Sequence, residues 1–425
     1  MISLGCAKNL VDSEILIGGL KQESYEIVQK SDNADILIVN TCGFLDTARE
    51  ESVDVILEAG ELRKSKKVEK LIVMGCFSDR YSSELREEMP EVDAFFGTDN
   101  HAQVLSYLTG KSFTKEDPDY FRSLLTPNHY AYLKIAEGCD NGCSFCSIPI
   151  MRGLQKSQPV KWNVQEAQRL ADSDVKELLI IAQDTTSYGW DLSPRSSLHE
   201  LLDELDKVSG LEWIRLHYAH PAHLHREMIQ RFSNLEKLIP YIDMPVQHGS
   251  DRVLKSMRRG LSSDGIKKRI EDLRKVNSEI SLRTSIIVGF PGETDELFLE
   301  TYNYLNEMDI SYLHVFTYSE RPNTAAVNLD GVVPKKVRAK RSKMLRGLSA
   351  KKRRSFYESQ LNNTLTVLFE NENKEGYING FTENYVKVKS PWNPALVNTL
   401  HTITLKEIDE DGLVRFEFAK NAVAV

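Results

Sequence analysis

A chain of 425 residues is long for one domain and suits two or three. With 41% apolar and 27% charged residues it has the composition of an ordinary globular protein, and no apolar run approaches a membrane span, so we expect no membrane partner. A net charge of −8 argues against nucleic-acid binding over the whole surface, although a basic patch could still bind it. Six cysteines do not make a secreted disulfide framework, and Met1 opens no signal-peptide pattern, so we predict the cytoplasm.

The first third of the chain alternates apolar runs with amphipathic stretches. We predict strands at residues 2–4, 35–39 and 71–74, with helices at about 12–21 and 46–64. Strands that alternate with helices form a parallel sheet, whose carboxyl ends all lie at one edge. The first strand is very short, which would fit a sequence that lacks a few residues at its start.

One cysteine follows each of these three strands: Cys6, Cys42 and Cys76. Taken alone, a cysteine is more often a small buried hydrophobic residue than a ligand. The repeated placement changes that interpretation, because a parallel sheet brings the three thiols to one edge although they lie far apart in sequence. Thiolates suit iron–sulfur clusters, so we predict a 4Fe-4S cluster on these residues, with one iron open.

The remaining cysteines, Cys139, Cys143 and Cys146, have the spacing C-x3-C-x2-C. Three thiolates from one loop hold three irons of a 4Fe-4S cube and leave the fourth open, as in a catalytic site. The alternatives are a chance cluster or a zinc knuckle completed by a histidine, and His129 falls outside the usual zinc spacings. The spacing resembles that of the radical S-adenosylmethionine enzymes, in which S-adenosyl-L-methionine chelates the open iron.

Six β/α units follow from residue 126, with predicted strands at 130–135, 178–182, 214–218, 241–246, 283–288 and 313–318. Six units are too few for a closed eight-stranded barrel, so we predict a partial (β/α)6 barrel with its site at the strand carboxyl ends. At these ends we expect Gln183 and Asp184 to receive the S-adenosylmethionine ammonium, Gln247 or Ser250 the ribose, and the backbone of Gly289 the adenine. The alternative for each residue is a turn former.

Three motifs around the first cysteines carry a family resemblance: Ser3-Leu4-Gly5-Cys6-Ala7-Lys8-Asn9, Val39-Asn40-Thr41-Cys42-Gly43-Phe44 and Val73-Met74-Gly75-Cys76. They resemble the N-terminal domain of the radical S-adenosylmethionine methylthiotransferases, in the branch that modifies the β-carbon of an aspartate in ribosomal protein S-twelve. The resemblance implies two 4Fe-4S clusters, a 5′-deoxyadenosyl radical that removes a hydrogen, and an electron donor such as flavodoxin or ferredoxin. It also places Phe145 beside the first cluster and the adenine, and the alternative is a core phenylalanine.

Two other features of the middle region have no assigned role. Arg152 matches the family motif that follows the cysteines, but its spacing gives no function. Four histidines, His217, His220, His223 and His225, cluster after the third predicted barrel strand. Their spacing fits no standard zinc pattern, so we expect this loop to shape the substrate pocket.

The last third begins with a basic run, in which eleven of residues 335–354 are Lys or Arg. A solvated helix face is the usual meaning of such a run, and a phosphate-binding stripe is the alternative. Predicted strands at 364–369, 376–380, 384–388, 401–405 and 414–418 then indicate a small antiparallel barrel that resembles a TRAM domain. Residues 358–425 hold ten acidic and six basic side chains, a net charge of −4 that suits a basic partner such as a ribosomal protein.

The chain is therefore predicted as an α/β protein with domains at 1–125, 126–334 and 358–425 and a basic helical linker at 335–357. Residues 317–324 and 380–388, however, resemble the tRNA-modifying branch of the family. A tRNA methylthiotransferase acting on threonylcarbamoyl- or isopentenyl-adenosine stays as an alternative, and a non-enzymatic iron–sulfur or RNA-binding protein as a more distant one. The sequence does not identify the electron donor, the sulfur source or the oligomeric state.

Overall fold

The computed structural model describes residues 1–113 and 122–419, so residues 114–121 and 420–425 of the predicted first and last domains lie outside the described residues. The chain divides into two compact units. The first comprises residues 1–125, 137–140 and 146–155, and the second comprises 126–136, 141–145 and 156–425. Among the described residues, no helix combines the length and the apolar character that crossing a membrane requires.

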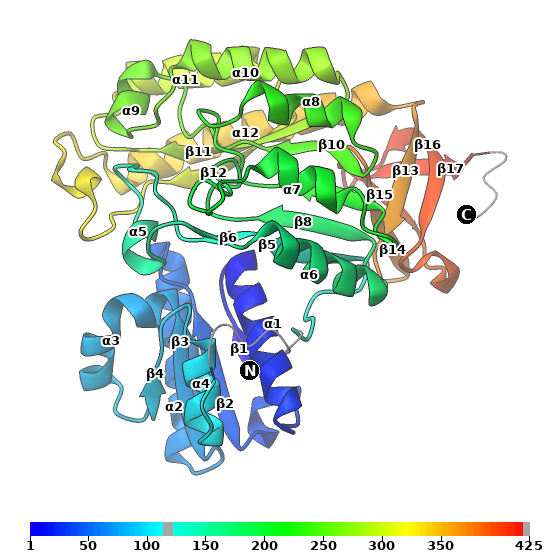
Figure 1. The fold of residues 1–425 in the computed structure, drawn as a ribbon. Helices are drawn as coiled ribbons and strands as arrows, with labels where there is room; N and C mark the ends of the chain where they lie inside the picture. The colour runs from blue at the N-terminus through cyan, green and yellow to red at the C-terminus, as the bar shows by residue number, and fades with distance from the viewer. Residues whose placement is uncertain (114–121, 420–425) are drawn as a thin grey trace. The chain divides into compact units, whose positions relative to one another are not determined.

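The first unit is built on a parallel sheet of four strands in the order β1-β2-β3-β4 (Figure 1). The strands are β1 (Ile2–Ser3), β2 (Ile36–Thr41), β3 (Lys70–Gly75) and β4 (Ala94–Phe95). The helices are α1 (Ala7–Gln22), α2 (Asp46–Lys64), α3 (Cys76–Glu88), α4 (His101–Thr109) and the single turn α5 (Ile148–Met151). The predicted parallel βαβ arrangement is confirmed, and β4 is a short edge strand that the sequence did not indicate.

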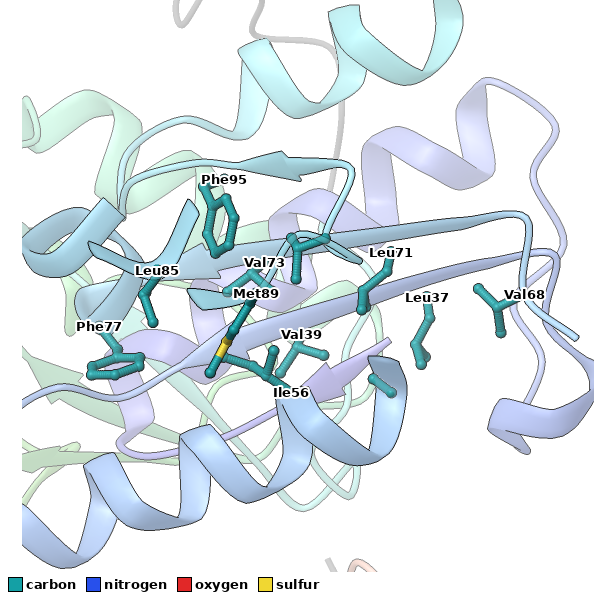
Figure 2. Close-up of a cluster of buried hydrophobic side chains, with 12 residues drawn as sticks. Leu37, Val39, Ile56, Val68, Leu71, Val73, Phe77, Leu85, Met89 and Phe95 are labelled. Atoms are coloured by element: carbon teal, nitrogen blue, oxygen red, sulfur yellow. The ribbon is translucent and has the colours of Figure 1, made fainter. Parts of the chain in front are cut away.

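Apolar side chains fill both faces of this sheet. Leu37, Val39, Leu71 and Val73 point into the core under α2 and α3, shown in Figure 2, and the alternate positions of β2 and β3 pack on the opposite face. Burial on both faces explains why these strands read as continuous apolar runs. The pairing aligns the last residues of the strands, so the loop after β2 and the first turn of α3, which directly follows β3, leave the sheet side by side.

The second unit contains a six-stranded parallel sheet in the order β12-β11-β10-β9-β8-β5. Its strands are β5 (Tyr130–Lys134), β8 (Glu177–Ile181), β9 (Trp213–Leu216), β10 (Leu238–Asp243), β11 (Ser281–Val288) and β12 (Tyr312–Thr317). Its helices are α6 (Val160–Asp172), α7 (Leu198–Leu205), α8 (Arg226–Asn234), α9 (Asp251–Ser256), α10 (Ser263–Val276) and α11 (Asp295–Glu307), and two-residue strands lie at β6 (Ala136–Glu137) and β7 (Lys156–Ser157). The partial (β/α)6 barrel is confirmed, with its loops at the carboxyl edge of one open sheet.

The basic segment, predicted as a helical linker at 335–357, forms one long helix, α12 (Lys335–Gln360). Two of its arginines point inward: Arg341 pairs with Glu293 and Asp295, and Arg338 pairs with Glu320. Most of the other cationic side chains of the helix are exposed. The basic run is therefore partly structural and partly a solvated face.

A closed five-stranded barrel ends the described chain, as predicted. Its strands are β13 (Thr364–Phe369), β14 (Tyr377–Thr382), β15 (Lys387–Pro391), β16 (Leu400–Ile408) and β17 (Val414–Phe418), and 3₁₀ turns occupy Ser31–Asn33, Ala325–Asn328 and Pro394–Leu396. The neighbours β15 and β17 run parallel, so the barrel is not antiparallel throughout. The predicted strand at 384–388 was wrong at its start, because Tyr385 has a positive φ of 70° and lies in the turn before β15.

This turn attaches the barrel to the six-stranded sheet. The guanidinium of Arg215 in β9 is buried, forms an ion pair with Glu177, and lies 4.7 Å from the ring centroid of Tyr385 and 5.0 Å from that of Tyr241. Its Nη1 also donates to the carbonyl oxygen of Glu383, at 3.3 Å. The barrel is therefore joined to the sheet by a buried cation surrounded by aromatic rings.

Glu383 makes the stability of this junction dependent on pH. Burial raises the pKa of its carboxyl to about 7, and the backbone N–H of Thr366 donates to it at 2.6 Å. Because the folded-state pKa lies above the ordinary 4.5, the folded chain favours the neutral carboxyl. Its contribution to the free energy of unfolding is complete below pH 4.5 and is lost as the pH rises through 7.

Glu383→Gln is expected to remove about 3 kcal/mol of this pH dependence. The measurement compares the free energy of unfolding of the variant with that of the parent, once at pH 5 and once at pH 8. An equal difference at both pH values would contradict the assignment.

Candidate cofactor sites

Asn9, in the first turn of α1, connects the loops that carry the three N-terminal cysteines. Its Nδ2 donates to the carbonyl oxygen of Leu4 at 3.0 Å, two residues before Cys6. It also donates to the carbonyl oxygen of Thr41 at 2.8 Å, one residue before Cys42. Its Oδ1 lies 3.6 Å from the Sγ of Cys76. One buried amide thus contacts the end of each strand. The sequence shows Asn9 as part of a motif, but only the fold reveals its partners.

Two glycines allow these loops to approach closely. A Cβ on Gly5 would lie 2.6 Å from the Cβ of Cys42, so the loop of Cys6 packs directly on that cysteine. Gly75 has a φ of 99°, and a Cβ there would lie 2.3 Å from Oδ1 of Asn40 and 2.6 Å from the carbonyl oxygen of Thr41. Both positions exclude a side chain, and both have a positive φ that favours glycine, 91° at Gly5 and 99° at Gly75.

Gly75→Ala is expected to destabilise the first unit by about 1–3 kcal/mol, because the new methyl group adds overlap to backbone strain. Gly110→Ala is the matched control: Gly110 has a φ of 72° at the end of α4, but its Cβ position is open. The control is expected to lose about 1 kcal/mol. Urea unfolding of the metal-free proteins measures both, and equal losses would show that the close approach at Gly75 contributes nothing.

The structure brings Cys6, Cys42 and Cys76 together. Cys42 and Cys76 are buried and Cys6 is exposed. Burial raises the pKa of Cys76 to about 12; the nearby Arg152 opposes this shift, and charge on Cys6 or Cys42 would add to it. Burial likewise raises the pKa of Cys42. Three converging thiols, one of them open to solvent, fit a metal–sulfur group, because metal coordination deprotonates a thiol that would otherwise stay neutral.

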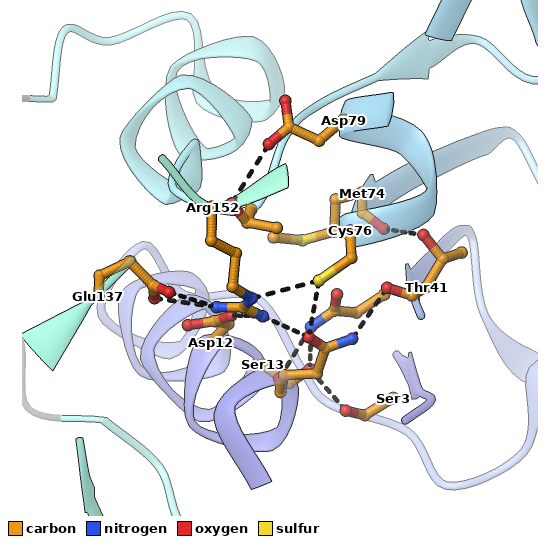
Figure 3. A network of polar contacts seen from close by, with 12 residues as sticks. Ser3, Asp12, Ser13, Thr41, Met74, Cys76, Asp79, Glu137 and Arg152 are labelled. Carbon is orange, nitrogen blue, oxygen red and sulfur yellow. Dashed lines mark hydrogen bonds and ion pairs between the residues drawn. The ribbon is translucent and has the colours of Figure 1, made fainter. Parts of the chain in front are cut away.

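Every nitrogen of the Arg152 guanidinium makes a polar contact, and Nε contacts one of the thiols. Nε donates to Sγ of Cys76 at 3.2 Å, Nη1 donates to both carboxylate oxygens of Glu137 at 2.9 Å, and Nη2 donates to Asp12 at 3.1 Å and to Asn9 (Figure 3). Burial works against this cation, but the charges of Asp12, Cys76 and Glu137 outweigh it and raise the pKa of Arg152 well above its ordinary value. The arginine therefore stays charged beside the thiols.

The C-x3-C-x2-C loop is divided between the units, with Cys139 and Cys146 in the first and Cys143 in the second. In the first unit, the N–H of Cys139 donates to the carbonyl oxygen of Gly153 at 3.1 Å. In the second unit, Ser144 is anchored at both its N–H and its hydroxyl, by the carbonyl oxygens of Met257 and Ser256. Each part of the cysteine loop is thus held by hydrogen bonds within its own unit.

Asp184 holds this loop through Asn141, whose Nδ2 donates to Oδ2 of the carboxylate at 2.8 Å. His223 contacts the same oxygen through Nδ1 at 2.7 Å, and Thr186 donates to Oδ1 through its N–H and its hydroxyl. Burial would raise the pKa of Asp184, but the bonds from His223 and Thr186 outweigh it and keep that pKa below the ordinary value. Asp184 is therefore an anion that already accepts four hydrogen bonds, in addition to its predicted contact with the S-adenosylmethionine ammonium.

Arg259 provides a second contact between an arginine and a cysteine. Its Nη1 donates to Sγ of Cys143 at 3.3 Å, and its Nη2 donates to the carbonyl oxygen of Pro245 at 2.7 Å. Arg259 comes shortly after α9 in the chain, and its side chain is buried. Neither the sequence motif nor the spacing indicated this contact.

Three other residues predicted to contact S-adenosylmethionine lie after strand ends. Gln247, with a φ of 77°, and buried Ser250 follow β10, and Phe145 is buried in the cysteine loop. Gly289 follows β11, but a Cβ there would lie 2.2 Å from Cγ of Arg338, so packing against this arginine also explains the glycine. The ligand contacts of these residues and of Gln183 stay predictions.

The histidine loop forms a smaller group than the sequence indicated. His220 and His223 stack with ring centroids 4.7 Å apart and lie with Asp184 within reach of one metal ion. Burial, followed by the charge of Arg259, lowers the pKa of His220 to about 3. A neighbouring cation weighs against a further metal ion here. The group instead supports Asp184 beside the cysteine loop.

Comparisons with known proteins identify the family of this chain. Residues 1–97 match the model of the uncharacterized protein family UPF0004, and residues 133–305 match the radical SAM superfamily. The ribosomal protein uS12 methylthiotransferase RimO of Aquifex aeolicus is 46% identical over 85% of this chain and 82% of its own length. RimO of Christiangramia forsetii is 43% identical over 90% and 84%. The chain belongs to the RimO family of radical SAM methylthiotransferases.

Among solved structures, the radical S-adenosylmethionine methyltransferase TsrM from Kitasatospora setae, with cobalamin and a [4Fe-4S] cluster bound, superposes with a TM-score of 0.56 at 12% identity. The match covers 76% of this chain and 71% of that chain and shows a shared fold. Membership of the RimO family implies S-adenosylmethionine and 4Fe-4S clusters as cofactors. The predicted ligands of these clusters are the two cysteine triads, whose thiolates suit iron–sulfur chemistry.

Proposed function

We propose that this protein adds a methylthio group to the β-carbon of an aspartate in ribosomal protein uS12, using S-adenosylmethionine and two 4Fe-4S clusters. The observation that carries the proposal is the second triad. A radical SAM enzyme needs one cluster, on Cys139, Cys143 and Cys146, whereas this chain also gathers Cys6, Cys42 and Cys76 at one sheet edge. A second group with an open iron suits the delivery of sulfur.

When bound, one cluster and S-adenosylmethionine would supply the one-electron cleavage of a sulfonium, and the other cluster would supply a sulfur donor. The chain supplies position and charge. Asp184 orients the cysteine loop through Asn141, and Arg259 places a positive charge at Cys143. Phe145 is buried in that loop, where its apolar ring would help to keep water from a bound cluster. Oriented ligands limit side reactions of a radical.

The proposed protein partner matches the charge of the C-terminal barrel. Residues 358–425 carry a net charge of −4, which favours a basic ribosomal protein over an RNA backbone. The electron donor is proposed to be a flavodoxin or a ferredoxin, because a low-potential cluster needs a one-electron reductant. The second candidate function, methylthiolation of a modified adenosine in tRNA, is supported by the likeness of residues 380–388 to the tRNA branch.

Mass spectrometry can separate these two functions. A bacterial strain that lacks its own uS12 methylthiotransferase is complemented with this chain, and both uS12 and bulk tRNA are examined. We expect uS12 to gain the mass of one methylthio group and the tRNA to stay unchanged. Modification of tRNA without modification of uS12 would overturn the assignment, and Cys42→Ala provides the inactive control.

A further inference from the structure

Two buried arginines contact the two cysteine triads in the same manner, and the proposed function assigns a role to neither. Arg152 donates from Nε to Sγ of Cys76 at 3.2 Å, and Arg259 donates from Nη1 to Sγ of Cys143 at 3.3 Å. Each arginine contacts one member of its triad. Both are at least 93% buried, since Arg152 is 7% exposed and Arg259 is 5% exposed.

The surroundings of Arg152 fix its orientation. Glu137 accepts two bonds from Nη1, and Asp12 and Asn9 accept from Nη2, so only Nε remains for the sulfur. A guanidinium is a rigid planar fork, and holding its two outer nitrogens determines where the third N–H points. The N–H aimed at Cys76 is therefore set by the polar network of the first unit (Figure 3).

Arg259 is held by a different and simpler arrangement. Its Nη2 donates to the carbonyl oxygen of Pro245, in the loop after β10, and its Nη1 reaches Cys143. Because a backbone carbonyl carries no net charge, the guanidinium keeps its full positive charge for the sulfur and its neighbours, including His220. Two different sets of hydrogen-bond partners thus orient an arginine N–H toward a cysteine sulfur.

We propose that Arg152 and Arg259 are positioning residues for the two metal–sulfur clusters, each donating an N–H···S hydrogen bond to one ligand sulfur. The inference rests on the proposed function, because it assumes that both triads bind clusters. Hydrogen bonds to ligand sulfurs and nearby positive charge favour the reduced cluster, so each arginine raises the reduction potential of its own cluster. An arginine that acted as a buried ion pair alone would change stability without changing that potential.

The test uses full-length chains that carry one triad each. In a Cys139→Ala, Cys143→Ala, Cys146→Ala background, the N-terminal cluster is reconstituted anaerobically and titrated by electron paramagnetic resonance. Arg152→Met is expected to lower the reduced fraction at a given potential about tenfold, which equals about 59 mV for one electron. Iron release to a chelator is expected to become about 10–100-fold faster. Arg259→Met in the same background is the matched control and is expected to change neither value.

The reciprocal background, Cys6→Ala, Cys42→Ala, Cys76→Ala, reverses the roles: Arg259→Met shifts the potential and Arg152→Met does not. Arg152→Lys keeps the charge but not the fork, so we expect a smaller shift in potential with faster iron release. If Arg152→Met fails to fold, the iron-release rate of Arg152→Lys tests the inference instead, and an unchanged rate would overturn it. Unchanged values, or equal shifts from both arginines in both backgrounds, would overturn the inference. Failure of a parent triad to bind about four irons would instead overturn the proposed function.

Discussion

Cys143→Ala is expected to abolish 5′-deoxyadenosine formation, whereas Cys42→Ala is expected to leave it and to abolish methylthio transfer. The two cysteines belong to different triads, and Cys143 lies in the loop anchored by Asp184 and Ser144 while Cys42 lies at the sheet edge of the first unit. Each variant is expected to keep about four of the eight irons of the parent. Chromatography of 5′-deoxyadenosine, mass spectrometry of uS12 and iron analysis of the anaerobic proteins measure the three values.

Replacing a buried thiol can also disturb packing, so the variants need a matched comparison. Cys6 is exposed, and Cys6→Ala removes a member of the N-terminal triad with little loss of packing. It is expected to reproduce the phenotype of Cys42→Ala. Normal 5′-deoxyadenosine formation by Cys143→Ala, or methylthio transfer by Cys6→Ala, would contradict the assignment of the triads.

Much of the fold was predictable because the sheets of this protein are buried on both faces. Continuous apolar runs such as 35–39 and 71–74 identified parallel strands, and the cysteines that follow them could then be placed at one edge. The edge strand β4 was not predicted, because two residues give no periodicity. The turn at Tyr385 was not predicted, because a tyrosine does not by its residue type indicate a positive φ, and its packing against Arg215 is seen only in the fold.

The contacts around the triads were not predictable, because they join residues far apart in the chain. Arg152 reaches Asn9 across 143 positions, and Arg259 reaches Cys143 across 116. Nothing in the local pattern of an arginine indicates which sulfur it will contact. Asp184 was found from the sequence as a polar residue after a strand, yet its partners Asn141 and His223 come from separate loops. The sequence thus predicts the ligands, and the fold shows which groups contact them.

Arg215→Met is expected to destabilise the second unit by about 3–5 kcal/mol, because it leaves the buried carboxylate of Glu177 without its cation. It also removes the contacts with Tyr241 and Tyr385 that join the barrel to the sheet. Urea unfolding of the metal-free chain measures the loss, and tryptophan fluorescence follows Trp213 in the same strand.

Arg231→Met is the matched control, because Arg231 pairs with Asp203 at 2.6 Å but both side chains are partly exposed. An exposed pair contributes at most about 1 kcal/mol. Adding Glu177→Gln to Arg215→Met is expected to recover part of the loss, since the buried charge disappears together with its partner. A loss below about 1 kcal/mol for Arg215→Met would show that the barrel is held by its apolar contacts, among them Trp213, Ile239 and Leu368, and not by the buried cation.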